Sequence, residues 1–202
     1  YAAGAVAAQI EQTSGSNFAG PKASAKNTTV DPIADLPDAS SLPKSQRKAY
    51  VLEGTDSIGE KGIHAQTEQA VRELEDKGYN VIRRLSGPIG TQKQFEAFIN
   101  SADMKGQTVV VSAHHYLNTS KPSTFVFGHE IPDSSVLSGI AGARRAVFLG
   151  CNTSGPANAF VVANPGASAW GTLGSIRPYW VVDGYGQYSA TILAYDRTRW
   201  YP

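Results

Sequence analysis

The stretch QTVVVSAHHY, residues 107–116, carries the pattern that decides the fold. Its valines follow one another without an intervening polar residue, which is typical of a strand buried on both faces of a sheet. A second apolar stretch, RAVFLGCNTSG at residues 145–155, leads directly into the only cysteine of the chain. The sequence therefore predicts two buried strands, the first ending at His114 and His115 and the second ending at Cys151.

Strands and amphipathic helices alternate around these two stretches. Expected strands are 49–54, 80–85, 107–115 and 145–151, with a short hairpin at 123–132. Expected helices are 63–78, 91–102 and 134–142, the last of them capped by Asp133. This order predicts an α/β fold, an open and mainly parallel sheet with helices on both faces that makes a three-layer sandwich.

Residues 1–47 differ in composition from the rest of the chain. They are rich in Ala, Ser, Gly, Asn and Pro and show little hydrophobic periodicity, so we expect a flexible tail, linker or pro-segment. The folded domain is expected at 48–202, where residues 158–166 fit a helix or a strand and residues 188–200 fit a strand or a final helix. The chain starts at Tyr1 without an initiator methionine or the basic flank of a signal peptide, and we expect this start to be a cut point within a longer chain.

Charge and cysteine content exclude several classes of function. The 18 Lys and Arg residues against 17 Asp and Glu residues give a net charge of +1, so neither nucleic acid nor an anionic membrane is expected as a partner. One cysteine excludes an internal disulfide and a zinc site made of several cysteines. His114 and His115 point to opposite faces of a strand and no further ligand set accompanies them, so we expect no bound metal.

The ends of the two predicted strands bring together residues that suit nucleophilic chemistry. In an open parallel sheet, ligands bind outside the carboxyl ends of the strands, so neighbouring strands would present the imidazoles and the thiol at one edge. A free cysteine has a pKa of about 8.5, and a nearby imidazole lowers that pKa or accepts the proton. Small residues on both sides of Cys151 leave room for a substrate, and the backbone N–H of Cys151 can face a developing oxyanion. The pattern predicts a His-Cys dyad, whereas a lone buried cysteine would be an inert apolar residue.

The order of these features resembles the caspase-like cysteine peptidases, most closely the CHAT-domain and metacaspase types. Members of that family have an apolar strand ending in small residues and His, then a short hairpin and a helix, then an apolar strand ending in Cys and small polar residues. VVVSAHHY, TFVFGHEIPDSSVLSGIAG and VFLGCNTSG follow the same order in this chain. The resemblance extends over roughly residues 48–176.

The resemblance implies a thiol protease, a hydrolase that cleaves peptide bonds with Cys151 as nucleophile and His114 or His115 as general base. It implies a protein or peptide substrate and no cofactor. CHAT-type members often belong to larger assemblies or bacterial effector systems. We therefore expect an effector or toxin fragment released from a larger parent chain, acting in a cytoplasm where a free thiol stays reduced.

One position departs from the family pattern. The residue after the catalytic His is normally glycine, yet here His115 follows His114 and Tyr116 follows His115. Alignment on the small residues before the pair favours His114 as the base, and alignment on the second His favours His115. Two other functions stay open: a catalytically inactive binding module of the same fold, which the missing glycine favours, and a small-molecule cysteine amide or acyl hydrolase.

Overall fold

The main sheet contains five parallel strands and one antiparallel edge strand among the described residues. The computed structural model describes residues 28–29, 31–54, 61–85, 92–100, 103–118, 120–174, 176–182, 188–194 and 198–201. In sheet order the strands are β12 (Thr198–Tyr201), β9 (Ser168–Thr172), β8 (Arg145–Leu149), β4 (Thr108–Ser112), β2 (Lys48–Glu53) and β3 (Asn80–Leu85). All neighbours pair in parallel except β12, which runs antiparallel to β9.

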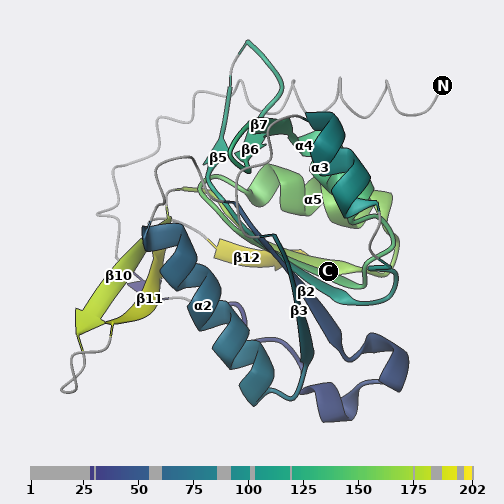
Figure 1. Cartoon of the computed structure of the whole chain (residues 1–202), viewed down its shortest axis with the longest axis vertical. Helices are drawn as coiled ribbons and strands as arrows, with labels where there is room; N and C mark the ends of the chain where they lie inside the picture. The colour runs from purple at the N-terminus through teal and green to yellow at the C-terminus, as the bar shows by residue number, and fades with distance from the viewer. Residues whose placement is uncertain are drawn as a thin grey trace.

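In the described ranges, four helices lie along the crossovers between the parallel strands. They are α2 (Lys61–Asp76), α3 (Gln92–Ile99), α4 (Asp133–Gly139) and α5 (Ser154–Ala163). The chain steps from β2 outward to β3, then returns across β2 to β4, β8 and β9, so the first crossover runs opposite to the later ones. Because such crossovers are right-handed, α2 falls on one face of the sheet and α3, α4 and α5 on the other (Figure 1). The predicted α/β fold with helices on both faces is confirmed.

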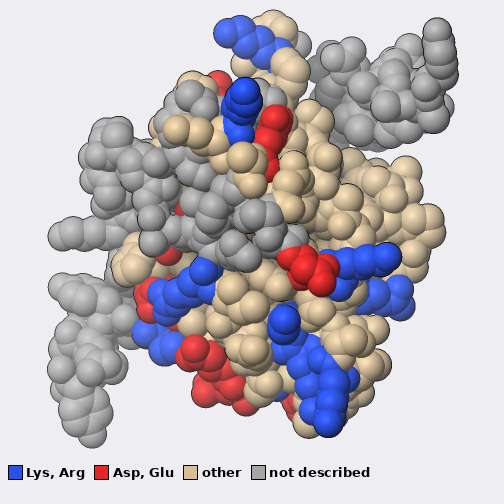
Figure 2. Space-filling model, turned by 45° about the vertical axis from the view of Figure 1, so that its right-hand side comes forward, with Lys and Arg blue, Asp and Glu red and all other residues tan. Residues whose placement is uncertain are grey.

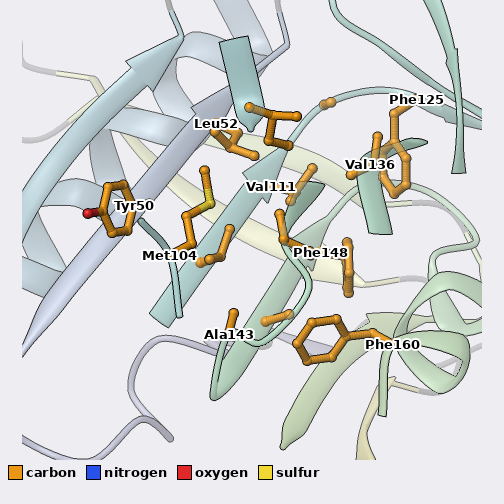
Figure 3. Packing of buried hydrophobic residues seen from close by; sticks show 14 of the residues in the cluster. Tyr50, Leu52, Met104, Val111, Phe125, Val136, Ala143, Phe148 and Phe160 are labelled. Carbon is orange, nitrogen blue, oxygen red and sulfur yellow. The ribbon is translucent and has the colours of Figure 1, made fainter. Parts of the chain in front are cut away.

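The side chains of the central strands alternate between two hydrophobic clusters. Val109 and Val111 of β4 pack with the cluster that includes α3, α4 and α5, and Figure 3 shows part of this cluster. Val110 lies between them in sequence and packs with the cluster under α2. Every residue of β4 is buried, as the unbroken valine run predicts.

The packed core extends across the expected domain start at residue 48. Residues 31–47 include two short 3₁₀ helices, η1 (Ala39–Ser41) and η2 (Lys44–Gln46). The apolar side chains of this segment that join the cluster under α2 are Ile33, Leu36, Ala39 and Leu42. The remainder of the expected tail, residues 1–27 and 30, lies outside the described residues.

A small antiparallel sheet lies beside the carboxyl end of β4. Its strands are β5 (His115–Tyr116), β6 (Thr124–Val126) and β7 (Glu130–Pro132), in that order. The last two form the hairpin predicted at 123–132, and β5 adds a third strand that contains His115. The histidine pair is therefore where the main sheet ends and the small sheet begins.

The C-terminal part of the chain resolves into a helix followed by strands. Residues 158–166, which fit either element, lie mostly in α5. The later strands are β10 (Ile176–Val182) and β11 (Tyr188–Ala194), which pair with the short β1 (Thr28–Thr29) in a second antiparallel sheet, followed by β12. The alternative of a final helix over 188–200 is wrong for the described residues of that range. The β10–β11 hairpin lies against α2 (Figure 1).

Charged side chains of both signs are interspersed on the face shown in Figure 2. This mixture fits the nearly balanced composition of the chain. Across the described ranges, no helix combines the length and apolar character needed to cross a bilayer.

Candidate functional site at the carboxyl ends of β4 and β8

The parallel pairing of β4 with β8 sets the geometry of the candidate site. Thr108 pairs with Arg145 and Ser112 pairs with Leu149, an offset of 37 residues in both cases. The pairing continues beyond the strands, because the N–H of Ala113 donates to the carbonyl of Leu149 at 3.2 Å. His114 and Cys151 are separated by the same 37 residues and each follows the last paired residue of its strand by two positions, so both lie just beyond the carboxyl ends of neighbouring strands.

Gly150 allows the two strand ends to approach each other closely. A Cβ atom at this position would lie 2.6 Å from the carbonyl oxygen of Ala113 and 3.4 Å from the Cβ of His115. The first distance is shorter than van der Waals contact with a backbone atom that cannot swing away. A side chain at residue 150 would therefore push the histidine segment away from the cysteine segment.

Cys151 lies in a sharp turn between β8 and α5. Cys151 forms no disulfide bond, and the residue is partly exposed. Asn152 has a φ of 55°, the left-handed region that residues other than glycine rarely adopt, and among the described non-glycine residues it alone has a positive φ. The N–H of Asn152 donates to the carbonyl of Gly174 at 2.8 Å. A strained strand-to-helix turn of this kind is a frequent way to present a nucleophile at a sheet edge.

Hydrogen bonds of the Thr153 side chain stabilise this turn. Its side chain is buried, and its hydroxyl lies 3.0 Å from the carbonyl oxygen of Phe148. The same hydroxyl accepts the N–H of Thr172 on the neighbouring strand β9 at 3.1 Å. These bonds connect the start of α5 to both β8 and β9, so the backbone around Cys151 is held on two sides.

The imidazole of His115 is turned into the protein. Its side chain is fully buried, and its ring packs against Phe125 with 4.6 Å between ring centroids. Nδ1 lies 2.9 Å from the carbonyl oxygen of Cys151, and Nε2 lies 3.2 Å from both carboxylate oxygens of Asp133. Each ring nitrogen of His115 thus has an oxygen atom as its hydrogen-bond partner.

His114 has a different environment from its neighbour. It is partly exposed, and its ring stacks on the exposed ring of Tyr116 with 6.1 Å between centroids. Its carbonyl accepts the N–H of Val126 at 3.0 Å, which starts the pairing between the histidine segment and β6. The side chain of His114 therefore lies toward the molecular surface, and that of His115 lies in the core.

The prediction that Asp133 caps a helix is wrong. Asp133 is the first residue of α4, and the preceding Pro132 occupies the N-cap position without a side-chain capping bond. The carboxylate of Asp133 instead contacts the ring of His115. A buried ring nitrogen without a partner costs more free energy than an exposed helix N–H, which water can satisfy, so the histidine takes the carboxylate. No sequence motif connects these two residues, because the β6–β7 hairpin lies between them.

A polar network supports the same sheet edge from the side of α2. Gln66 donates from Nε2 to the carbonyl of Leu149 at 2.9 Å and to Oγ of Ser112 at 3.1 Å. The hydroxyl of Thr67 lies 2.9 Å from the same Ser112 oxygen. Glu53 is buried at the end of β2, and its carboxylate lies 2.9 Å from Nδ1 of His64. Sequence reasoning missed this network because Gln66 and Thr67 look like ordinary polar positions of a helix.

Comparisons with known proteins assign neither a family nor a function to the chain. No model of a protein family matches the chain, and no curated protein sequence matches it. Within the part of the chain that the structure describes, no three His, Cys, Asp or Glu side chains come together in a group able to hold a metal ion.

Proposed function

We propose that the chain is a cysteine endopeptidase in which Cys151 is the nucleophile and His114 the general base. The observation that carries the proposal is the parallel pairing of β4 with β8, whose carboxyl ends lead into His114 and Cys151 at one edge of the sheet. The turn at Asn152, the close approach at Gly150 and the resemblance of both strand ends to caspase-like peptidases support it.

His114 is assigned as the base because the ring of His115 is engaged elsewhere. The carbonyl oxygen of Cys151 can only accept a hydrogen bond, so Nδ1 of His115 must carry a proton and donate it. Nε2 of His115 faces the Asp133 carboxylate. A ring held in this way has no free nitrogen to receive the thiol proton, whereas the ring of His114 lies toward the surface.

The backbone of His115 suits the role that glycine has in caspase-like peptidases. The bond from Val126 to the His114 carbonyl makes those two residues a hydrogen-bonded antiparallel pair. By alternation, His115 opposite Phe125 is a non-hydrogen-bonded pair, so the N–H of His115 points away from β6. The side chain of His115 is buried, so it is turned away from the molecular surface. We assign the N–H groups of His115 and Cys151 as the donors that stabilise the oxyanion.

The proposed reaction proceeds through an acyl-enzyme. The Sγ of Cys151 attacks the scissile carbonyl while His114 takes the thiol proton. The peptide C–N bond then breaks as His114 returns that proton to the leaving amine. Water, deprotonated by His114, then attacks the thioester carbonyl, and the C–S bond breaks as His114 returns the proton to Sγ, which releases the acid and restores the thiol. This chemistry uses no cofactor.

The proposed substrate is a protein or peptide, and the rest of a larger parent chain is a further candidate partner. A reactive thiol is maintained in a reducing compartment, so we place the activity in a cytoplasm.

The proposal is tested by incubating a denatured proteome with the protein or with Cys151→Ala and sequencing new amino termini by mass spectrometry. New termini that depend on Cys151 are expected, with a shared residue before each cut. If both samples give the same blank result, the peptidase proposal is rejected. Hydrolysis of amides or thioesters of small molecules that requires Cys151 would then favour the small-molecule hydrolase. Absence of that hydrolysis would favour the binding module.

A further inference from the structure

The contacts of His115 require more protons than a neutral imidazole has. One ring nitrogen faces the carbonyl oxygen of Cys151, and the other faces both oxygens of Asp133. A carbonyl and an ionised carboxylate only accept hydrogen bonds, while a neutral imidazole has one N–H. If Asp133 is ionised and the ring is neutral, one nitrogen lone pair faces an oxygen lone pair inside the core.

Burial makes this mismatch costly. The side chain of His115 is fully buried, and the side chain of Asp133 is 19% exposed. Water therefore has little access to relieve two lone pairs that face each other. An imidazolium between the carbonyl and the carboxylate satisfies every atom, and the adjacent negative charge balances its positive charge.

We propose that Asp133 is a positioning residue for Cys151, since its carboxylate keeps the His115 ring doubly protonated and the Nδ1–H of that ring fixes the Cys151 carbonyl. The peptide unit between Cys151 and the left-handed Asn152 is then held in one orientation. This orientation sets the direction in which the thiol leaves the backbone. The contact between His115 and the Cys151 carbonyl is observed independently of any activity. Its importance for turnover rests on the proposed peptidase function.

The protonation state is tested in the unaltered protein. Nitrogen-15 NMR of the histidine rings at neutral pH is expected to show both nitrogens of His115 carrying protons, with the signals assigned by their loss in His115→Gln. A spectrum in which one His115 nitrogen is unprotonated at neutral pH would overturn the proposal. This measurement requires neither a substrate nor a stable Asp133 variant.

The positioning effect is tested on the thiol, because the chain has a single cysteine and intact-mass measurement of iodoacetamide labelling reports on Cys151 alone. Asp133→Ala is expected to slow alkylation at neutral pH roughly ten-fold, since the charge-assisted bond that orders the turn is lost. Asp133→Asn is expected to slow it less, because its amide can still bond a neutral ring. Asp103→Asn is the matched control, since Asp103 is exposed and precedes the opposite, amino end of β4.

The alkylation rates and melting temperatures distinguish this proposal from the peptidase proposal. They also distinguish it from a role of Asp133 that is limited to stabilising α4. A role limited to bracing would lower the melting temperature of Asp133→Ala and leave the alkylation rate of the folded protein equal to that of the control, which would overturn the proposal. If the protein cleaves no substrate but alkylation slows as expected, the peptidase function fails and the positioning role stands.

Discussion

Nδ1 of His115 lies 2.9 Å from the carbonyl oxygen of Cys151, so the buried member of the histidine pair holds the backbone of the cysteine. The partly exposed member, His114, follows the carboxyl end of β4 as Cys151 follows that of the neighbouring strand β8. The two adjacent histidines thus differ in role: His115 stabilises the backbone, and His114 is the candidate for proton transfer.

Replacement of each histidine by alanine is expected to separate these tasks. His114→Ala should reduce Cys151-dependent cleavage about a hundred-fold or more, because the general base is lost, and should leave the thermal melting temperature nearly unchanged. His115→Ala should lower the free energy of unfolding by about 2–4 kcal/mol, because it opens a cavity beside Phe125 and leaves the Asp133 carboxylate without its ring partner.

The exposed His129, in the turn between β6 and β7, is the matched control for both variants. Cleavage rate and denaturant unfolding of the three alanine variants are the measurements. Full activity in His114→Ala together with an unchanged stability in His115→Ala would contradict the division of roles.

Gly150→Ala is expected to destabilise the protein by about 1–3 kcal/mol. The added methyl group would lie 2.6 Å from the Ala113 carbonyl, so the ends of β4 and β8 must separate. Gly155→Ala is the control, because nothing lies within 4 Å of a Cβ there and the residue is inside α5. That control should gain about 0.5–1 kcal/mol from helix propensity. Equal stability of the two variants in urea denaturation would show that the close approach is not required.

Glu73 gives the stability a defined pH dependence. Burial raises the pKa of this carboxyl from its ordinary value of 4.5 to about 7, and the nearby charge of Asp31 adds to the increase. Between these two pH values the folded protein holds a proton that the unfolded chain has released, so stability falls as pH rises from about 4.5 to about 7. Glu73→Gln should remove this slope and make the variant more stable than the unaltered protein above pH 7.

The control for this prediction is Glu75→Gln on the same helix, because the side chain of Glu75 is exposed. Urea unfolding at several pH values is the measurement. A stability difference between Glu73→Gln and the unaltered protein that stays constant across this range would refute the raised pKa.

Arg145 is a partly buried cation whose removal should cost little. Burial lowers the pKa of its guanidinium, and its Nη1 atom is buried without a hydrogen-bond partner in the part of the chain described. Arg145→Met should leave the free energy of unfolding unchanged or raise it by up to about 1 kcal/mol, since Nη1 has no hydrogen bond to lose and an unfavourable buried charge disappears. Arg83→Met, which breaks an ion pair with Glu68, should instead lower it slightly. A loss of more than about 2 kcal/mol in Arg145→Met would reveal an essential partner for the guanidinium.

The parallel core is predictable from the sequence because strands buried on both faces consist of apolar residues. The valines of β4 and the apolar run of β8 have no polar face, and the helix between β2 and β3 places its apolar residues on one side. The location of Cys151 and the histidine pair at strand ends follows from the same pattern.

Other features have no local trace in the sequence. Ile33 and Leu36 are isolated among turn-forming residues, and only the tertiary fold shows that they enter the core under α2. The contact of Asp133 with His115 crosses 18 residues and depends on how the β6–β7 hairpin folds back. The strands at the C-terminal end have mixed patterns, because β12 pairs only at the sheet edge.

The role of Cys151 is decided by one comparison, the time course of new amino termini in a denatured proteome with the protein or with Cys151→Ala. Termini that accumulate with the cysteine-containing protein and are absent with the alanine variant are the expected result. Termini that accumulate at equal rates in both samples, or in neither, would contradict the assignment of Cys151 as a peptidase nucleophile.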